Sequence, residues 1–259
     1  MPVVDVNGAR LWYDEAGSGE AVLLVHGGLG DAGLWEPVVP FLAKRFRTIR
    51  TDLRFFGSST GPAVPWSWQD DTVGVLDELG IGRAALVGLS LGGKIALDVA
   101  LAHPDRLWAV AGVAPALGGH DSAPYTDEHE ARYDATPDDE KLATMMEIDF
   151  EVWAPLGADD RIRQLWRATP DANPLPDGVE PSEPAGAPAN ERLGELAVPT
   201  LVVTAKHDPP GFREIGPLVA NAAPNARHVE LDSDHYVTLR EPGLVADTLS
   251  DFLTPLAPG

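Results

Sequence analysis

The chain has 259 residues, 44% of them hydrophobic and 23% charged, which suits one large α/β domain with a sizeable core. Its formal net charge of −21 repels phosphate and argues against nucleic acid or an anionic membrane surface as a partner. The absence of cysteine excludes disulfides, thiolate catalysis and cysteine metal sites. With no signal-like start and no long apolar run in the sequence, we expect a cytoplasmic protein without a membrane span.

In chain order, the first pattern is a hairpin. Extended runs at 3–6 and 10–15 flank Asn7-Gly8, two residues that tolerate the positive φ of a tight turn. Short apolar runs predict later strands, and apolar residues spaced three and four apart predict helices between them. The predicted strands are 21–25, 46–51, 84–87, 107–113, 200–204 and 227–231, and the predicted helices are 35–43, 68–79, 92–101 and 239–253. This alternation predicts a doubly wound, mostly parallel sheet of about eight strands.

Residues 116–193 interrupt the alternation between two strand patterns. The segment is acidic at first and rich in proline from Pro170 onward, and inserts of this length are usually lids or linkers. Residues 142–150 and 160–166 have helical patterns. We therefore expect a core formed by 1–115 and 194–259 and a small helical cap at 116–193. The order of its proline-rich return, around 172–190, is left open.

Gly88-Leu89-Ser90-Leu91-Gly92 lies between the apolar run 84–87 and a run of helix formers. A Gly-x-Ser-x-Gly pattern at a strand-to-helix junction is typical of a nucleophile elbow, in which a sharp turn exposes the serine hydroxyl. A plain glycine-rich turn without chemistry is the alternative, so the hypothesis depends on suitable partners for Ser90.

A nucleophilic serine needs a base, and the base needs a carboxylate to orient it. Of the seven histidines, His235 is the best candidate because it follows the last predicted strand, at the sheet edge where an elbow is exposed. Asp208 follows the strand pattern 200–204, so we expect it at the same edge of the sheet. For the oxyanion, the glycines after the strand 21–25 predict Gly28 as one N–H donor, with Leu29 as the runner-up, and Leu91 as the other.

These motifs together resemble the α/β-hydrolase superfamily, in its group of small, cap-bearing serine hydrolases. The resemblance rests on His26-Gly27-Gly28, on the turn that begins at Asp52, on the elbow and on the order Ser90, Asp208, His235. Two residues depart from the family pattern, because Phe55 and Asp234 stand where glycine is usual. Asp234 is expected either to raise the pKa of His235 or to point to solvent, and the Phe55 ring to reshape the wall near the site.

The resemblance implies hydrolysis of a carboxylic ester or lactone of a small molecule, without a cofactor or metal, by a monomer or homodimer. We also expect a substrate pocket whose lining comes mostly from the insert. Its candidate residues are Leu29, Phe55, Met145, Met146, Phe150, Trp153, Trp166 and Tyr236. Other chemistry of the fold stays open, namely carbon–carbon bond hydrolysis, proline iminopeptidase or perhydrolase activity, or a biosynthetic cyclase or thioesterase. A receptor that binds a small molecule without catalysis is the non-enzymatic alternative.

Overall fold

A computed structural model describes residues 2–62, 65–167, 169 and 180–258. Its strands form one eight-stranded sheet in the order β1-β2-β4-β3-β5-β6-β7-β8. The first two strands are antiparallel to their neighbours and the other six are parallel, which confirms the predicted architecture. The strands are β1 Val3–Val6, β2 Ala9–Ala16, β3 Ala21–Val25, β4 Arg47–Thr51, β5 Ala84–Leu89, β6 Leu107–Val113, β7 Thr200–Ala205 and β8 Ala226–Leu231.

The hairpin between β1 and β2 has the predicted turn. Asn7 and Gly8 have φ values of 49° and 78°, and Val6 pairs with Ala9 across them. Positive φ at both central residues is the requirement that makes Asn-Gly a favoured hairpin turn.

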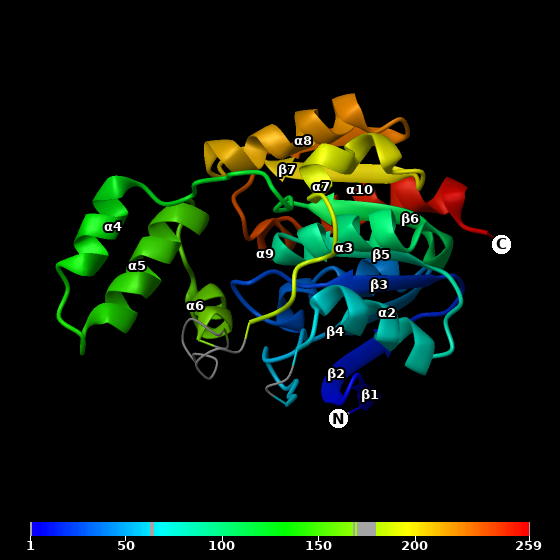
Figure 1. The fold of residues 1–259 in the computed structure, drawn as a ribbon, viewed down its shortest axis with the longest axis horizontal. Coiled ribbons are helices and arrows are strands. Elements are labelled where there is room, and N and C mark those ends of the chain that lie inside the picture. Colours follow the sequence, from blue (N-terminus) through cyan, green and yellow to red (C-terminus); the bar gives the residue numbers. More distant parts are fainter. Residues whose placement is uncertain (1, 63–64, 168, 170–179, 259) are drawn as a thin grey trace.

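Helices cover both faces of the sheet (Figure 1). Alternate residues of β3 belong to different apolar clusters: Val22 and Leu24 to one, Leu23 and Val25 to the other. The first cluster includes residues of α10 (Pro242–Leu253), and α1 (Val39–Leu42) lies on that side. The second includes residues of α2 (Trp68–Glu78), α3 (Leu91–Ala102) and α8 (Pro210–Ala222). Burial on both faces explains why the central strands read as unbroken apolar runs.

The predicted helix at 239–253 is two helices, α9 (Val237–Arg240) and α10. Glu241 between them has φ −125° and ψ 50°. Proline disfavours the helical conformation of the residue before it and starts helices well, so Pro242 ends one helix and begins the next.

The insert between β6 and β7 contains the predicted helical segments as α5 (Lys141–Trp153) and α6 (Asp160–Trp166). It also contains α4 (Asp127–Asp134), which the sequence patterns missed, and α7 (Ala189–Arg192). In Figure 1, α4 and α5 extend to one side of the sheet, whereas α7 lies over α3. Residues 170–179, at the start of the predicted proline-rich return, lie outside the described residues. The limits of the cap stay a prediction. Among the described helices, none is long and apolar enough to cross a membrane.

Candidate active site

Ser90 occupies a strained turn between β5 and α3. Its φ of 54° and ψ of −114° lie in a region that non-glycine residues rarely adopt, and such strain collects at functional sites. The surroundings hold it there: its N–H donates to the Val113 carbonyl at 2.9 Å, and its carbonyl accepts from the Ala116 N–H at 3.0 Å.

Two glycines let the strand and the helix approach at this turn. A Cβ atom on Gly88 would collide with the backbone of Gly92, and one on Gly92 would collide with the carbonyl groups of Val25 and His26. The glycines of the motif are therefore required by the close approach of three backbone segments.

His235 and Asp208 lie beside each other at the carboxyl edge of the sheet. His235 Nδ1 is 3.1 Å from Asp208 Oδ1, and the two residues are 3% and 5% exposed. Backbone bonds between the two loops set this contact, since the His207 N–H donates to the Ser233 carbonyl at 3.0 Å. The neighbouring His207 instead directs Nε2 to the exposed Asp232, at 2.9 Å.

Ser90 and His235 line one small cavity of about 10 Å³, together with Gly27, Leu29, Leu34, Leu89 and Tyr236. This volume is about that of one water-sized probe. His235 Nε2 is buried and makes no hydrogen bond to any described residue, Ser90 Oγ included. The ring nitrogen opposite the aspartate therefore has no partner among the described residues, and the histidine lines the same cavity as the serine.

Two aromatic rings enclose the His235 imidazole. The Trp153 ring, at the end of α5, has its centroid 4.4 Å away, and the Phe212 ring, in α8, lies edge-on at 5.4 Å. Trp153 and Phe212 also contact each other at 4.9 Å. The insert thus reaches the histidine directly, and Phe212 is a site residue that no sequence pattern indicated.

The loop after β3 is fixed next to the elbow by His26. Its Nε2 accepts the Leu53 N–H at 2.9 Å, which places the proton on Nδ1, where it donates to the Gly27 carbonyl at 2.8 Å. Burial lowers the pKa of His26 below its usual value against the opposing effect of Asp52, so the neutral ring is favoured. His26 is a structural group that holds this loop.

Gly28, one of the two predicted oxyanion donors, lies near the side chain of Leu91, the other. A Cβ atom on Gly28 would lie 4.0 Å from Leu91 Cδ2, and one on Gly27 would lie 3.0 Å from the Ser90 Cβ. Leu91 is the first residue of α3, and the first N–H groups of a helix have no acceptor within it.

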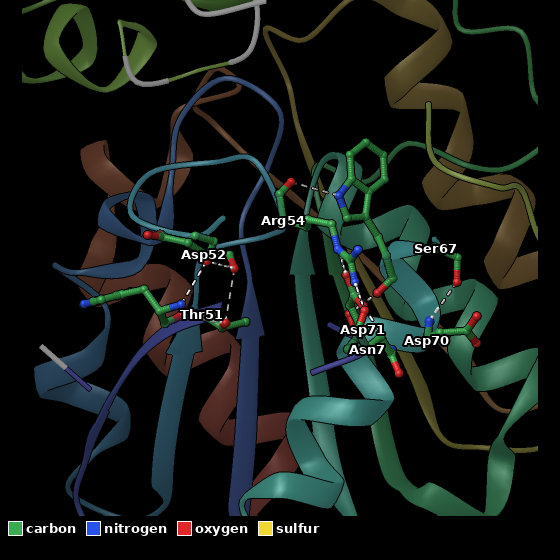
Figure 2. A network of polar contacts seen from close by, with 11 residues as sticks. Asn7, Thr51, Asp52, Arg54, Ser67, Asp70 and Asp71 are labelled. Carbon is green, nitrogen blue, oxygen red and sulfur yellow. Dashed lines mark hydrogen bonds and ion pairs between the residues drawn. The ribbon is translucent and has the colours of Figure 1, made fainter. Parts of the chain in front are cut away.

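The turn that begins at Asp52 supports the same loops (Figure 2). The Asp52 carboxylate accepts the N–H groups of Ala32 at 2.9 Å and Ser58 at 2.8 Å, and burial raises its pKa above the usual value. Two residues later, the buried Arg54 forms a two-pronged ion pair with Asp71, with both contacts at 2.8 Å.

Phe55 adopts the left-handed backbone that glycine favours, with φ 69°. This explains why a glycine is usual at this point of the family pattern. Its ring packs edge-on against Trp66, with centroids 5.4 Å apart, and is not among the described residues that line the Ser90 cavity.

Asp234 corrects the expectation that its carboxylate points to solvent. It is fully buried and accepts two hydrogen bonds from Arg240, at 2.6 and 2.7 Å. It also accepts the Leu156 N–H at 3.2 Å, and Arg240 donates to the Gly157 carbonyl at 2.5 Å. The pair ties the α5–α6 connection of the insert to the loop that carries His235.

We expect Arg240→Ala to lower the free energy of unfolding by about 3 kcal/mol, because it leaves Asp234 buried without its cation. Denaturant unfolding would measure the change. Arg240→Lys keeps the charge but not the fork of donors, so it should lower the free energy of unfolding by less than Arg240→Ala does. An Arg240→Ala protein as stable as the parent would contradict this account of the ion pair.

The other predicted pocket residues lie farther out in the insert. Met145 lines a separate cavity of about 350 Å³ between α4 and α5. Phe150 packs against Trp166 at 6.3 Å, whose Nε1 donates to the buried Asp149 at 2.6 Å. Met146 packs against the adjoining apolar cluster. None of these four is among the described residues of the Ser90 cavity, which takes only Leu29 and Tyr236 from the predicted set.

The described part of the chain contains no group of three histidine or carboxylate side chains placed to hold a metal ion. A cavity of about 640 Å³ is lined by Lys94, Asp98 and the segment 182–189, and Ser90 is not among its lining residues. Ser90 and His235 line the small cavity instead.

Comparison with known proteins places these features in a family. The model of the α/β-hydrolase fold family matches residues 20–242. A 2-hydroxy-6-oxo-6-phenylhexa-2,4-dienoate hydrolase of Comamonas testosteroni is 31% identical over 223 residues, covering 79% of this chain and 77% of that protein. A 2-hydroxymuconate semialdehyde hydrolase of Pseudomonas sp. (strain CF600) is 41% identical, but the match covers only 39% of this chain and 38% of that protein.

Among solved structures, the enol-lactonase from Burkholderia xenovorans LB400 superimposes with a TM-score of 0.76 at 26% identity, covering 98% of this chain and 100% of that chain. Both the sequence and the fold therefore agree with the resemblance drawn from the motifs. The chain belongs to the α/β-hydrolase family.

Proposed function

We propose that the protein is a serine hydrolase that cleaves a carboxylic ester or lactone of a small molecule through Ser90, His235 and Asp208. One observation is the main support for the proposal. A serine in a strained elbow shares a cavity with a histidine whose far nitrogen is bonded to a buried carboxylate.

In this mechanism His235 Nε2 removes the proton of Ser90 as Oγ attacks the carbonyl carbon. Asp208 holds the proton on Nδ1 and stabilises the imidazolium that forms. His235 then protonates the leaving alkoxide, and water reverses the sequence to release the acid. A hydrogen bond from Oγ to Nε2 has to form for the first step, and such bonds often tighten only when substrate is bound.

The developing oxyanion would be held by backbone N–H groups. Leu91 at the start of α3 is one donor, and Gly28 is the other, with Leu29 as the alternative. Preorganised donors of this kind supply roughly 3–4 kcal/mol each to transition-state stabilisation. The mechanism requires no cofactor.

Substrate entry requires the insert to move. The cavity of about 10 Å³ is far smaller than an ester substrate, and Trp153 covers the histidine from the insert side. We infer that residues 116–193 act as a cap whose opening enlarges this cavity. Trp153, Phe150, Met145, Met146 and Trp166 stay candidates for the pocket of the open form.

Carbon–carbon bond hydrolysis is the second candidate, favoured by the names of the Comamonas and Pseudomonas relatives, a dienoate hydrolase and a semialdehyde hydrolase. Both chemistries use the same serine, so the elbow does not distinguish them. The name of the structural relative from Burkholderia, an enol-lactonase, favours the ester or lactone assignment.

A substrate panel separates the two. Purified protein is assayed with p-nitrophenyl butyrate, with δ-valerolactone and with a 2-hydroxy-6-oxohexa-2,4-dienoate, each beside Ser90→Ala. We expect turnover of the ester or the lactone that is lost in Ser90→Ala. Turnover of the dienoate alone would replace the proposal by the second candidate, and turnover that survives in Ser90→Ala would remove Ser90 from the chemistry.

A further inference from the structure

Tyr236 is one of the residues around the cavity that holds Ser90 and His235, and its hydroxyl group has no role in the mechanism above. The residue is 1% exposed, yet its hydroxyl has no hydrogen-bond partner among the described residues. A buried polar group without a partner costs about 1–3 kcal/mol. Buried hydroxyls are normally paired, so an orphaned one at a reactive site points to a partner that arrives with the substrate.

Two carboxylates that act electrostatically on Tyr236 accept hydrogen bonds from other donors. Asp149, which acts electrostatically on Tyr236, accepts from Tyr125 at one oxygen and from Trp166 at the other, both at 2.6 Å. Asp234 accepts from Arg240 and from the Tyr236 backbone N–H. Neither carboxylate accepts a hydrogen bond from the Tyr236 hydroxyl.

The phenol remains a donor over the working pH range. Burial, and after it the Asp149 and Asp234 carboxylates, raise the pKa of Tyr236 above its usual value. The O–H group is thus retained at neutral pH, where it can donate one hydrogen bond.

The surroundings also restrict the charge of the acceptor. The described residues that line the cavity include no lysine or arginine. Arg240 is near Tyr236, but its guanidinium donates to Asp234 and to the Gly157 carbonyl. A carboxylate on the substrate would have to be buried here without a cation, which is costly. An ether, carbonyl or hydroxyl oxygen avoids this cost.

We propose that the Tyr236 hydroxyl donates a hydrogen bond to a neutral oxygen of the substrate close to the scissile carbonyl, which makes Tyr236 a specificity-determining residue and the substrate an uncharged, oxygen-bearing ester or lactone. The inference rests on the proposed function and deepens it.

Matched substrates test it. p-Nitrophenyl methoxyacetate differs from p-nitrophenyl butyrate by an ether oxygen in place of one methylene, and the 3-methoxypropanoate differs likewise from the pentanoate. We expect Tyr236→Phe to lower kcat/KM about fivefold on at least one ether ester, the effect of one neutral hydrogen bond. Both alkyl esters should stay within about twofold of the parent. Tyr133→Phe, which removes a hydroxyl from α4 beside the separate cavity, serves as the control. It should leave the ratio of kcat/KM between the ether ester and the alkyl ester unchanged in both pairs.

A second pair of substrates tests whether the site disfavours a negatively charged substrate. The p-nitrophenyl monoester of adipic acid should have kcat/KM at least about tenfold below that of its methyl ester, because only the former buries a carboxylate.

Equal losses on ether and alkyl esters would indicate a structural hydroxyl and overturn the inference, as would no loss on either pair or preference for the anionic ester. Failure of the proposed function looks different. It would appear as no Ser90-dependent turnover of any ester by the parent protein, and would remove this inference with it.

Discussion

Asp208→Asn should lower kcat for an ester substrate by about 10⁴-fold while the protein stays folded. The asparagine keeps the shape of the side chain but can present an N–H group to His235 Nδ1, which favours the wrong imidazole tautomer. It also removes the negative charge that stabilises the imidazolium. The contact concerned joins Asp208 Oδ1 to His235 Nδ1 at 3.1 Å, with both side chains buried. Steady-state kinetics with p-nitrophenyl butyrate would measure the loss, and thermal unfolding would check the fold.

Asp232→Asn is the matched control for this experiment. Asp232 is an exposed carboxylate that pairs with His207 and Lys206 on the neighbouring loop, so the variant removes the same charge a short distance away. Its kcat should stay within about twofold of the parent because exposed pairs contribute little. If Asp208→Asn retained a near-parental rate, the acid would have to be sought elsewhere.

Arg54→Met should lower the free energy of unfolding by about 3–5 kcal/mol, because it leaves Asp71 as a buried carboxylate without its cation. The Arg54 and Asp71 side chains are 0% and 2% exposed, and Asn7 keeps only a single hydrogen bond to Asp71, at 3.0 Å. Figure 2 shows this cluster between β1, the turn after β4 and the start of α2. Urea unfolding followed by circular dichroism would measure the change.

Two companion variants make the prediction specific to the buried pair. Arg54→Met with Asp71→Leu removes both charges and should recover part of the lost stability, since apolar replacement of a buried pair is often tolerated. Arg10→Met breaks an exposed contact with Asp5 and should stay within about 0.5 kcal/mol of the parent. A single Arg54→Met variant no less stable than Arg10→Met would show that the cluster is not a stabilising one.

The elements best predicted from sequence are those whose patterns depend on local chemistry. The hairpin followed from Asn7-Gly8, and β3 and β5 followed from apolar runs that need cover on both faces. The placement of Ser90, Asp208 and His235 at one sheet edge follows from the same alternation, because parallel strands end side by side. The elbow was identifiable because any such turn needs glycines at these positions, where a Cβ atom would collide with neighbouring backbone.

The elements that the patterns missed depend on tertiary contacts. The helix α8 begins at Pro210 and contains Gly216 and Pro217, residues that lower helix propensity. It is held by burial of residues such as Ile215 against the sheet. Asp234 likewise reads as a loop carboxylate until the fold brings Arg240 and the α5–α6 connection to it.

The pocket was the least predictable part of the site. Apolar residues of α5 and α6 read alike in sequence, but Trp153 contacts His235 whereas Met145 lines a different cavity. Which side of a helix meets the site depends on how the insert docks. This docking uses the buried Asp234–Arg240 pair, where Asp234 accepts the Leu156 N–H, rather than a periodic pattern.

The central claim is that Ser90 is a nucleophile activated by His235, and its most direct test is labelling of the native protein with a fluorophosphonate followed by peptide mass spectrometry. The account predicts one adduct on the peptide that contains Ser90, with labelling abolished in Ser90→Ala and strongly slowed in His235→Ala. Absence of labelling in the native protein, or an adduct on another residue that persists in Ser90→Ala, would contradict it.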